Sequence, residues 1–398
     1  MIAEAVRVAI DGQTHADIVA DLIAVDVDED VDRAGVFAVR VAAATRPDGT
    51  WSYVDDPRLA VWRRITVEIG YGDGAEAVID GYVTHVETSL DTEVDKAYVE
   101  VSGMDATALM NRAERRVAWP DRKDHEIAIE IFRSYGLAYE VQDTGTVHEQ
   151  DVSTVVQVET DIRFLRRLAA RNGFECRVRG ATGIFRPANL TDPPQRMLVL
   201  SGGADGSLVR ASATVDGTVP YETEVRAVDP ESRQVVRRAL TTLPVPALGA
   251  RPASAQADGL PPNRVYVSGA AGAGQSDLDA LLHAVYEPAE RMVTLTGEID
   301  SRVYRGVLRA GRLVTVRGLG KAHSGQYYVG CVGHSVTADS YRQTFTAYRN
   351  AVGPTGREQF STPAEPAPIT AGGGSGARRS GNRVLPARPT TTSGGTRR

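Results

Sequence analysis

Cysteine is scarce in this sequence, with only Cys176 and Cys331 among 398 residues. The two lie far apart and neither belongs to a CxxC pair, which excludes a redox motif and a cysteine-rich zinc site. A small secreted domain held by disulfides needs several closely spaced cysteines. We therefore expect both to be reduced residues of a buried core.

Long apolar runs are also missing. No uninterrupted apolar stretch approaches the roughly 20 residues that a membrane helix needs. Residues 1–11 include acidic Glu4 and alternate in polarity, whereas a secretory signal begins with a basic segment followed by an apolar one. The sequence predicts synthesis and assembly in the cytoplasm, with no membrane anchor.

A net positive charge is lacking in residues 1–350, where acidic residues outnumber basic ones. Lysine occurs only at Lys96, Lys123 and Lys321, and the net charge is −6. Residues 351–398 hold seven arginines and two glutamates, so residues 1–350 carry −11. A nucleic-acid binder needs a basic face against the phosphates. The acidic body therefore argues against a nucleic-acid partner.

What is present is β periodicity. Apolar and polar residues alternate in 5–10, 36–41, 65–69 and 77–86, with glycine-containing turns at 47–49 and 72–74. Such a meander closes most economically into a small barrel. We predict that residues 1–105 form a first β-barrel domain.

Helical spacing replaces this alternation in residues 106–195. Helices are predicted at 105–112, 124–135 and 160–172, and short strands at 174–178 and 183–186. The third helix places Ile162, Leu165 and Leu168 on one face, and Gly173 is positioned to end it. Residues 106–195 are therefore a predicted α+β domain.

Period two returns in residues 196–350, which we predict to be a second β-barrel domain. It carries a loop rich in Pro, Gly and Ala near 243–263, a helix at 276–291, and strands at 292–299, 313–316, 327–336 and 343–348. Residues 351–398 contain almost no large apolar side chain and are predicted to be a flexible basic tail. The predicted fold class is α+β, mainly β, with two barrels flanking the α+β domain and a disordered tail.

Motifs with chemistry are absent or incomplete. The loop 269–274 reads GxxGxG, which is neither a dinucleotide fingerprint nor a P-loop. The acidic run 26–32 resembles a calcium loop, but Val31 stands where glycine is required and Phe37 where glutamate should close the shell. We expect this run to be a solvated hairpin tip or a partner-facing acidic edge.

Histidines give no metal pattern either. His148, His323 and His334 lack the spacing of a zinc site, and no serine lies in a GxSxG elbow. A pair of catalytic carboxylates cannot be recognised from sequence alone. We therefore predict no catalytic residue, no cofactor and no metal site, and a protein that is not an enzyme.

Several sequence motifs, which occur in the same order, resemble those of the phage late control D family. They are Val101–Asp105 with Leu109, Asp124–Leu137, Gln157–Ala169 with Gly173-Phe174-Glu175, Leu308–Gly311, Gly325–Val329, and Val332–Ser335. The family includes the base-plate hub of contractile phages and the N-terminal hub part of valine-glycine repeat proteins. The similarity extends from about residue 5 to 350, and the stretch from Gln157 is its strongest part.

The resemblance implies two barrels of the tail-tube type and a homotrimer whose six barrels form a ring. Such a hub would adapt a hexameric inner tube to a threefold spike protein, in contact with other base-plate proteins and with a cargo effector as a further candidate partner. No needle or lysozyme-like segment follows residue 350, so we expect the spike to be a separate polypeptide. The particle would be a phage tail, a type VI apparatus or a released extracellular injector, and the sequence does not choose among them.

Two other functions stay open at this point. The chain could be a glycan-acting tail-associated enzyme, which activity on peptidoglycan would identify. It could also be a carbohydrate-binding adhesin, which would bind a glycan without tube or spike proteins. The order of the family phrases favours the structural hub.

Overall fold

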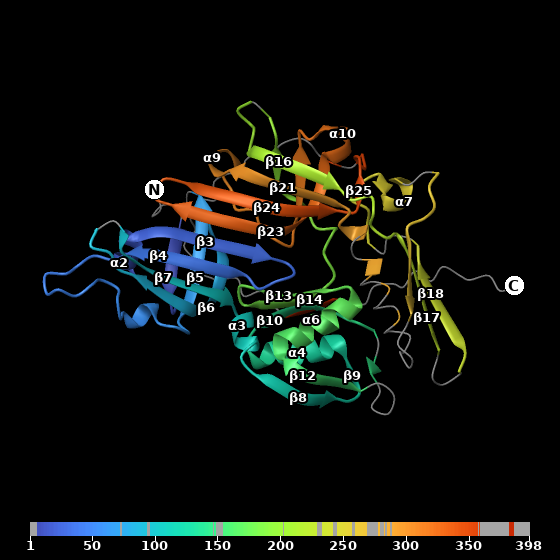
Figure 1. Ribbon diagram of the computed structural model, residues 1–398, viewed down its shortest axis with the longest axis horizontal. Coiled ribbons are helices and arrows are strands. Elements are labelled where there is room, and N and C mark those ends of the chain that lie inside the picture. Colours follow the sequence, from blue (N-terminus) through green and yellow to red (C-terminus); the bar gives the residue numbers. More distant parts are fainter. Residues whose placement is uncertain are drawn as a thin grey trace.

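The computed structural model describes residues 6–71, 74–93, 96–145, 147–148, 154–201, 203–228, 233–241, 245–256, 259–268, 278, 282, 285–286, 289–356, 358 and 382–385. Two β units lie side by side, an α+β unit packs beneath them, and a narrow β-sheet projects at the right of Figure 1. Among the described helices, none is long and apolar enough to cross a membrane.

The first β unit comes from the start of the chain. Its elements are β1 (Val6–Ile10), β2 (Gln13–Thr14), α2 (Ala16–Ala20), β3 (Leu22–Asp30), β4 (Val36–Ala42), η1 (Pro57–Leu59), β5 (Arg64–Tyr71), β6 (Gly74–Ser89) and β7 (Tyr98–Asp105). Alternate residues of these strands point inward, for example Val25, Val27, Val39 and Val41, and they form one buried core. Burial of this face is what selects the strand period in the sequence.

The second β unit is built in the same way. Its elements are β15 (Gln195–Val199), β16 (Leu208–Val215), β21 (Val293–Asp300), α9 (Ser301–Tyr304), β22 (Leu313–Arg317), α10 (Gly320–His323), β23 (Gly325–Thr337), β24 (Tyr341–Arg349) and β25 (Ala351–Val352). Leu295, Ile299, Val316, Tyr327 and Ala347 belong to its separate buried core.

The two units repeat one topology. Neighbouring strands follow the order β3-β4-β7-β6-β5 in the first unit and β16-β21-β24-β23-β22 in the second. Strand register shifts occur at matching places: after Leu22 in β3 and Leu208 in β16, and between Val83 and His85 in β6 and Val329 and Cys331 in β23. Bulges are specific local features of a strand pair, so their recurrence identifies a duplicated module.

One strand joins the two modules into a continuous sheet. The first residues of β23 pair with β22, from Gly325 to Tyr328. On the same side, its later residues pair antiparallel with β3, from Cys331 opposite Asp30 to Thr337 opposite Ala24. The result is a 13-stranded sheet that runs through both units (Figure 1).

The α+β unit lies between the β units along the chain. Its elements are α3 (Thr107–Met110), β8 (Glu114–Trp119), β9 (Arg122–Lys123), α4 (Asp124–Ser134), β10 (Ala138–Gln142), β11 (Val147–His148), β12 (Val155–Thr160), α6 (Asp161–Asn172), β13 (Glu175–Arg179) and β14 (Thr182–Arg186). Phe132, Phe164, Leu165 and Phe185 lie in its core. Gly173 ends α6 in the left-handed conformation, at φ 62°. The first predicted helix, 105–112, is much shorter in the structure.

An inserted segment connects β16 to β21. It contains β17 (Glu222–Val228), β18 (Val235–Leu240), β19 (Arg251–Pro252), α7 (Ala253–Gln256) and β20 (Arg264–Ser268), with β18, β17 and β20 forming the projecting sheet. The buried Arg349 anchors the base of this segment by donating to the carbonyl oxygens of Leu248 (2.9 Å) and Gly353 (2.6 Å). The predicted loop near 243–263 thus includes short regular elements.

Part of the sequence interpretation falls outside the described residues. The loop 269–274 does so, as does the start of the helix predicted at 276–291, whose described residues from 278 to 290 are helical. Within the predicted tail, β26 (Arg383–Leu385) pairs in parallel with β10. Residues 359–381 and 386–398 lie outside the described part of the chain.

The predicted fold class is confirmed: the chain is α+β, mainly β, with two β units of one topology and a small α+β unit. The interpretation of the acidic run 26–32 was wrong. Residues up to Asp30 belong to β3, which pairs on one side with β4 and on the other with β23, so it is not an edge strand. Asp26, Asp28 and Asp30 alternate outward because Val25 and Val27 face the core, whereas Glu29 lies on the inner side and is 11% exposed.

A substitution at Gly103 on β7 would test how tightly the first module packs at the bulge between β6 and β7. A Cβ there would overlap the Tyr82 carbonyl oxygen and lie 2.7 Å from the Phe37 ring. We expect Gly103→Ala to lower the free energy of unfolding by on the order of 2–3 kcal/mol, since the obstructing backbone cannot give way. Gly217→Ala, where nothing lies within 4 Å of the new Cβ, is the control and should gain or lose no more than about 1 kcal/mol. Denaturant unfolding measures both, and equal stabilities would contradict the bulge geometry.

Candidate functional site

The residues shared with the resembled family lie at joints between elements. Asp105 ends β7 and is 3% exposed. Its carboxylate accepts hydrogen bonds from the Thr107 N–H (2.9 Å), which begins α3, and from the Gly35 N–H (2.7 Å) in the turn between β3 and β4. Burial raises the pKa of Asp105, opposed by these hydrogen bonds. Asp105 therefore fixes where the first β unit passes into the α+β unit.

The motif that begins at Gln157, which has the strongest family resemblance, forms a second connection between elements. Gln157 on β12 is fully buried, accepts from the Trp119 indole N–H (3.3 Å) and donates to Asp161 (2.7 Å). The other carboxylate oxygen of Asp161 accepts from the Tyr135 hydroxyl (2.7 Å), at the end of α4. Arg115 lies 3.3 Å from the same oxygen. The polar residues of this phrase thus lock β12, β8, α4 and α6 together.

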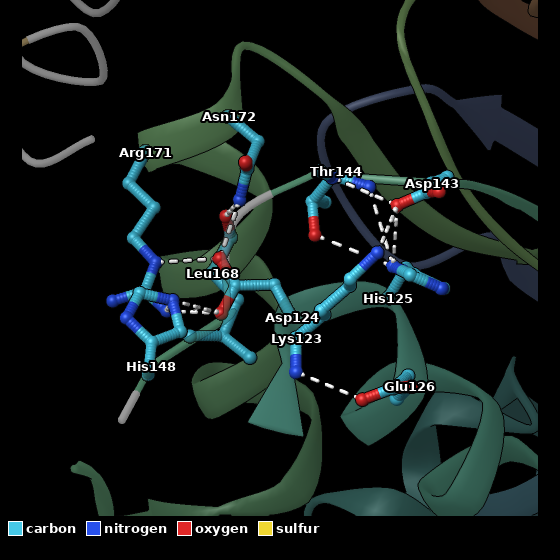
Figure 2. A network of polar contacts seen from close by, with 11 residues as sticks. Lys123, Asp124, His125, Glu126, Asp143, Thr144, His148, Leu168, Arg171 and Asn172 are labelled. Atoms are coloured by element: carbon cyan, nitrogen blue, oxygen red, sulfur yellow. Dashed lines mark hydrogen bonds and ion pairs between the residues drawn. The ribbon is translucent and has the colours of Figure 1, made fainter. Parts of the chain in front are cut away.

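A third polar network surrounds Asp124, the first residue of α4 (Figure 2). Arg171 donates to both of its carboxylate oxygens, at 2.7 Å from Nε to Oδ2. Asn172 donates to Oδ2 (2.6 Å), and His148 Nε2 lies 3.1 Å from Oδ1. In Figure 2 the side chains from α6 and β11 converge on this one carboxylate.

The electrostatics of this network favour a fixed carboxylate. Burial acts to raise the pKa of Asp124, but hydrogen bonds from His148, Arg171 and Asn172 outweigh it and lower the pKa to about 2. Such a group is ionised at neutral pH, and both of its oxygens already accept hydrogen bonds. Beside it, the Glu126 carboxylate accepts from the Lys123 N–H (2.9 Å) at the start of α4. The arrangement resembles a structural anchor more than an acid–base pair.

The three units meet at a cluster of buried charges. Glu29 on β3 and Arg309 before β22 form an ion pair at 2.6 Å, with each side chain 11% exposed. The second Glu29 oxygen accepts from the Ala310 N–H (3.0 Å), and Arg309 also reaches Glu76 on β6 (3.4 Å). Burial raises the pKa of Glu29, and the Arg309 guanidinium opposes that shift. This pair ties the two β units together.

The α+β unit enters the same cluster through β13. The Tyr328 hydroxyl on β23 donates to Glu175 (2.6 Å), and Arg177 lies 3.6 Å from the other oxygen of Glu175. Gly311 adopts φ 77°, and a Cβ there would overlap the Arg177 guanidinium. The family phrase Leu308–Gly311 therefore serves close packing of the junction.

The three histidines considered as metal ligands lie on different elements: His148 on β11, His323 at the end of α10 and His334 on β23. His148 is bonded to Asp124, and His334 Nδ1 lies 2.9 Å from the Tyr341 hydroxyl. Burial, with the nearby Arg309 guanidinium, lowers the pKa of His334 to about 3. The described ranges hold no group of three or more His, Cys, Asp or Glu side chains able to bind a metal ion. A surface hollow of about 440 Å³ is lined by Arg317, Gly318, Gly320, Lys321, Ser324 and Pro354.

Sequence reasoning named no site residue and missed the charge cluster. Glu29 and Arg309 are 280 residues apart, and neither belongs to a motif with known chemistry. The sequence signals for this cluster are indirect: Leu308–Gly311 and Val332–Ser335 are two of the motifs that resemble the phage late control D family. The structure shows that these phrases surround the junction.

Solved structures share this fold. The 43 kDa tail protein of prophage MuSo2 from Shewanella oneidensis has a TM-score of 0.62 and 14% identity, over 87% of this chain and 99% of that one. A tail protein from Neisseria meningitidis MC58 has a TM-score of 0.59 and 16% identity, over 87% of this chain and 96% of that one. The third structure is an Escherichia coli component of the type VI secretion system, described as similar to the bacteriophage T4 tail proteins gp27 and gp5. It has a TM-score of 0.53 and 14% identity, over 86% of this chain and 76% of that one. The fold is therefore that of tail proteins.

The sequence also matches a family model. The model described as the Alg8 N-terminal domain matches residues 3–338. The chain belongs to this family. No curated protein matches it.

Gln157 provides a test of the joint at β12. We expect Gln157→Leu to destabilise the chain by roughly 2–4 kcal/mol, because the buried Trp119 N–H and Asp161 carboxylate each lose a partner. Val158→Thr is the matched control on the same strand, where the side chain is 62% exposed, and it should change stability by no more than about 0.5 kcal/mol. Thermal and denaturant unfolding give both values. Equal effects would show that the Gln157 network does not stabilise the fold.

The network around Asp124 predicts a specific loss of folding stability at acidic pH. Its pKa falls from 3.8 to about 2 on folding, so its contribution is complete above about pH 5 and is lost progressively as the pH falls through 3.8 toward 2. Asp124→Asn should be less stable at pH 7 by on the order of 2 kcal/mol and should lose less stability between pH 4 and pH 2. Asp339→Asn, in the exposed turn before β24, should keep the wild-type pH profile. Parallel profiles for all three proteins would contradict the network.

Proposed function

We propose that this chain is the structural hub of the base plate of a contractile phage-tail-like injection system. In this role it forms a homotrimer that seats a hexameric inner tube above a threefold spike protein. The chain works by rigid assembly and catalyses no reaction. It is made and assembled in the cytoplasm and becomes part of a tail or injection particle.

The duplicated β module is the observation that carries this proposal. Each chain contains the same five-strand order twice, with matching bulges. Three copies therefore supply six equivalent modules, so a threefold assembly gains a near-sixfold ring. A hub between a hexameric tube and a trimeric spike needs this combination of symmetries.

Two further observations support the same role. The fold is shared with prophage tail proteins and with a type VI secretion component described as similar to gp27 and gp5. The ordered motifs that resemble the phage late control D family lie at structural joints, at Asp105, Gln157 and Gly311. Polar residues used as fixed joints suit a protein that transmits force.

The partners follow from this role. They are two further copies of the chain, the inner tube protein, the spike protein and other base-plate proteins, with a cargo effector as an additional candidate. The acidic body gives no support for a nucleic-acid partner. The large interfaces of an obligate assembly would join these proteins.

Assembly with tube and spike components tests the proposal. We expect the full chain, mixed with the inner tube and spike proteins of its particle, to form a species whose hub content is three times the 42.6 kDa chain, measured by mass photometry and native mass spectrometry. A chain that stays monomeric in the mixture would overturn the hub. Peptidoglycan hydrolysis by the chain alone would favour the glycan-acting enzyme, and glycan binding without tube or spike would favour the adhesin.

A further inference from the structure

Within the described residues, each half of β6 has a strand partner on one side only. Its residues from Gly74 to Tyr82 pair with β5, and those from Gly81 to Ser89 pair with β7. On the β5 side, within the described residues, His85 to Ser89 have no strand partner. The matching part of β23 in the second module is not open, because there β3 pairs with Cys331 to Thr337.

The strand β16 has the complementary opening. It corresponds to β3 and pairs with β21 on one side. Its other side faces no strand within the described part of the chain. Val209 and Val215 on or beside this edge are 58% and 40% exposed. The described strands thus leave two open edges, on the second half of β6 and on β16, and the counterparts of these edges, on β23 and β3, are paired with each other within the chain.

We propose that β6 of one copy pairs with β16 of the next copy, antiparallel and in the register that β23 and β3 use within one chain. The inference rests on the proposed hub and names the surface through which its copies join. The binding partner at both edges is a second copy of this chain. The reason is the internal pairing, which shows that these two strand types of the duplicated module already fit together.

The bulges fix the expected register. Aligning the shifts in β6 and β23 makes His85 equivalent to Cys331, and aligning those in β3 and β16 makes Arg210 equivalent to Ala24. The internal pairs then translate directly. They place His85 opposite Asp216, Val86 opposite Val215, Ser89 opposite Ser212, Leu90 opposite Ala211, and Asp91 opposite Arg210 of the next copy.

The side chains on this register are complementary. On the core-facing side, Val86 would meet Val215 and the 48% exposed Leu90 would meet Ala211, which extends the apolar core across the junction. On the outer side, Asp91 would meet Arg210, whose side chain is 76% exposed beside Glu298. A shift of one residue would turn these apolar side chains to solvent and separate the opposite charges.

The internal junction shows what such a pairing provides. Val336 of β23 packs in the core of the first unit, and Val31 after β3 packs in the core of the second. A head-to-tail contact of this type uses a different edge on each copy, so it closes into a ring when the rotation allows it. In the proposed trimer, three internal and three intermolecular junctions would then alternate.

Paired cysteines test the register in the full-length chain. Ser89→Cys and Ser212→Cys are combined in a Cys331→Ser background, because Cys331 is partly exposed and Cys176 is buried. Directly opposed residues place their Cβ atoms about 4.5–5.5 Å apart, close enough for a disulfide after small movements. With tube and spike proteins present, we expect mild oxidation to give covalent dimers and trimers on a denaturing gel, at least tenfold above either single-cysteine variant.

The matched control is Ser89→Cys with Ala213→Cys, since a shift of one residue turns the thiol to the other face of the sheet. It should give no more cross-linking than the single variants. A trimer by mass photometry without the Ser89–Ser212 cross-link, or with equal cross-linking in the control, would overturn this pairing and leave the hub proposal standing. A chain that remains monomeric with tube and spike would overturn both.

Discussion

The pairing of β23 with β3 is the interaction on which the rest of the structure depends. An edge strand exposes backbone N–H and C=O groups that seek another strand, and folded proteins must cover or pair such edges. Here β23 runs past its own unit and supplies that partner to β3. The two β units therefore share one sheet, and their relative position is set by backbone hydrogen bonds as well as by side-chain packing.

The buried charges at this junction give it a unique register. Removing Glu29 and Arg309 from water is costly, and apolar side chains of similar size would often stabilise a core more. A buried ion pair is nevertheless selective, because a slip of one residue would leave both charges unpaired. Glu29 is bonded to Arg309 and to the Ala310 N–H, so the second unit is held to β3 at a single position.

Local features of this fold could be predicted from the sequence, whereas long-range ones could not. Alternation located most strands, and the apolar stripe of α6 with Gly173 at its end located the best-defined helix. Two β-barrel domains could be predicted, but no repeat is visible between their sequences, because equivalent positions share inward or outward direction and little else. For example, Gly103 corresponds to Ala347, and Val39 to Gly297. The Glu29–Arg309 pair joins residues 280 positions apart, which no local pattern can connect.

The difference between the two modules matters as much as their likeness. Residues 31–35 connect β3 to β4, whereas the equivalent connection between β16 and β21 runs from 216 to 292 and carries the projecting sheet. In a ring of three chains the shared strands would recur six times and the inserted segment three times. The duplicated strands would then supply the near-sixfold part of the hub, and the insertion would reduce the symmetry to threefold. In such a ring, one chain would present both symmetries, because its two modules share one strand order and differ most in this one connection.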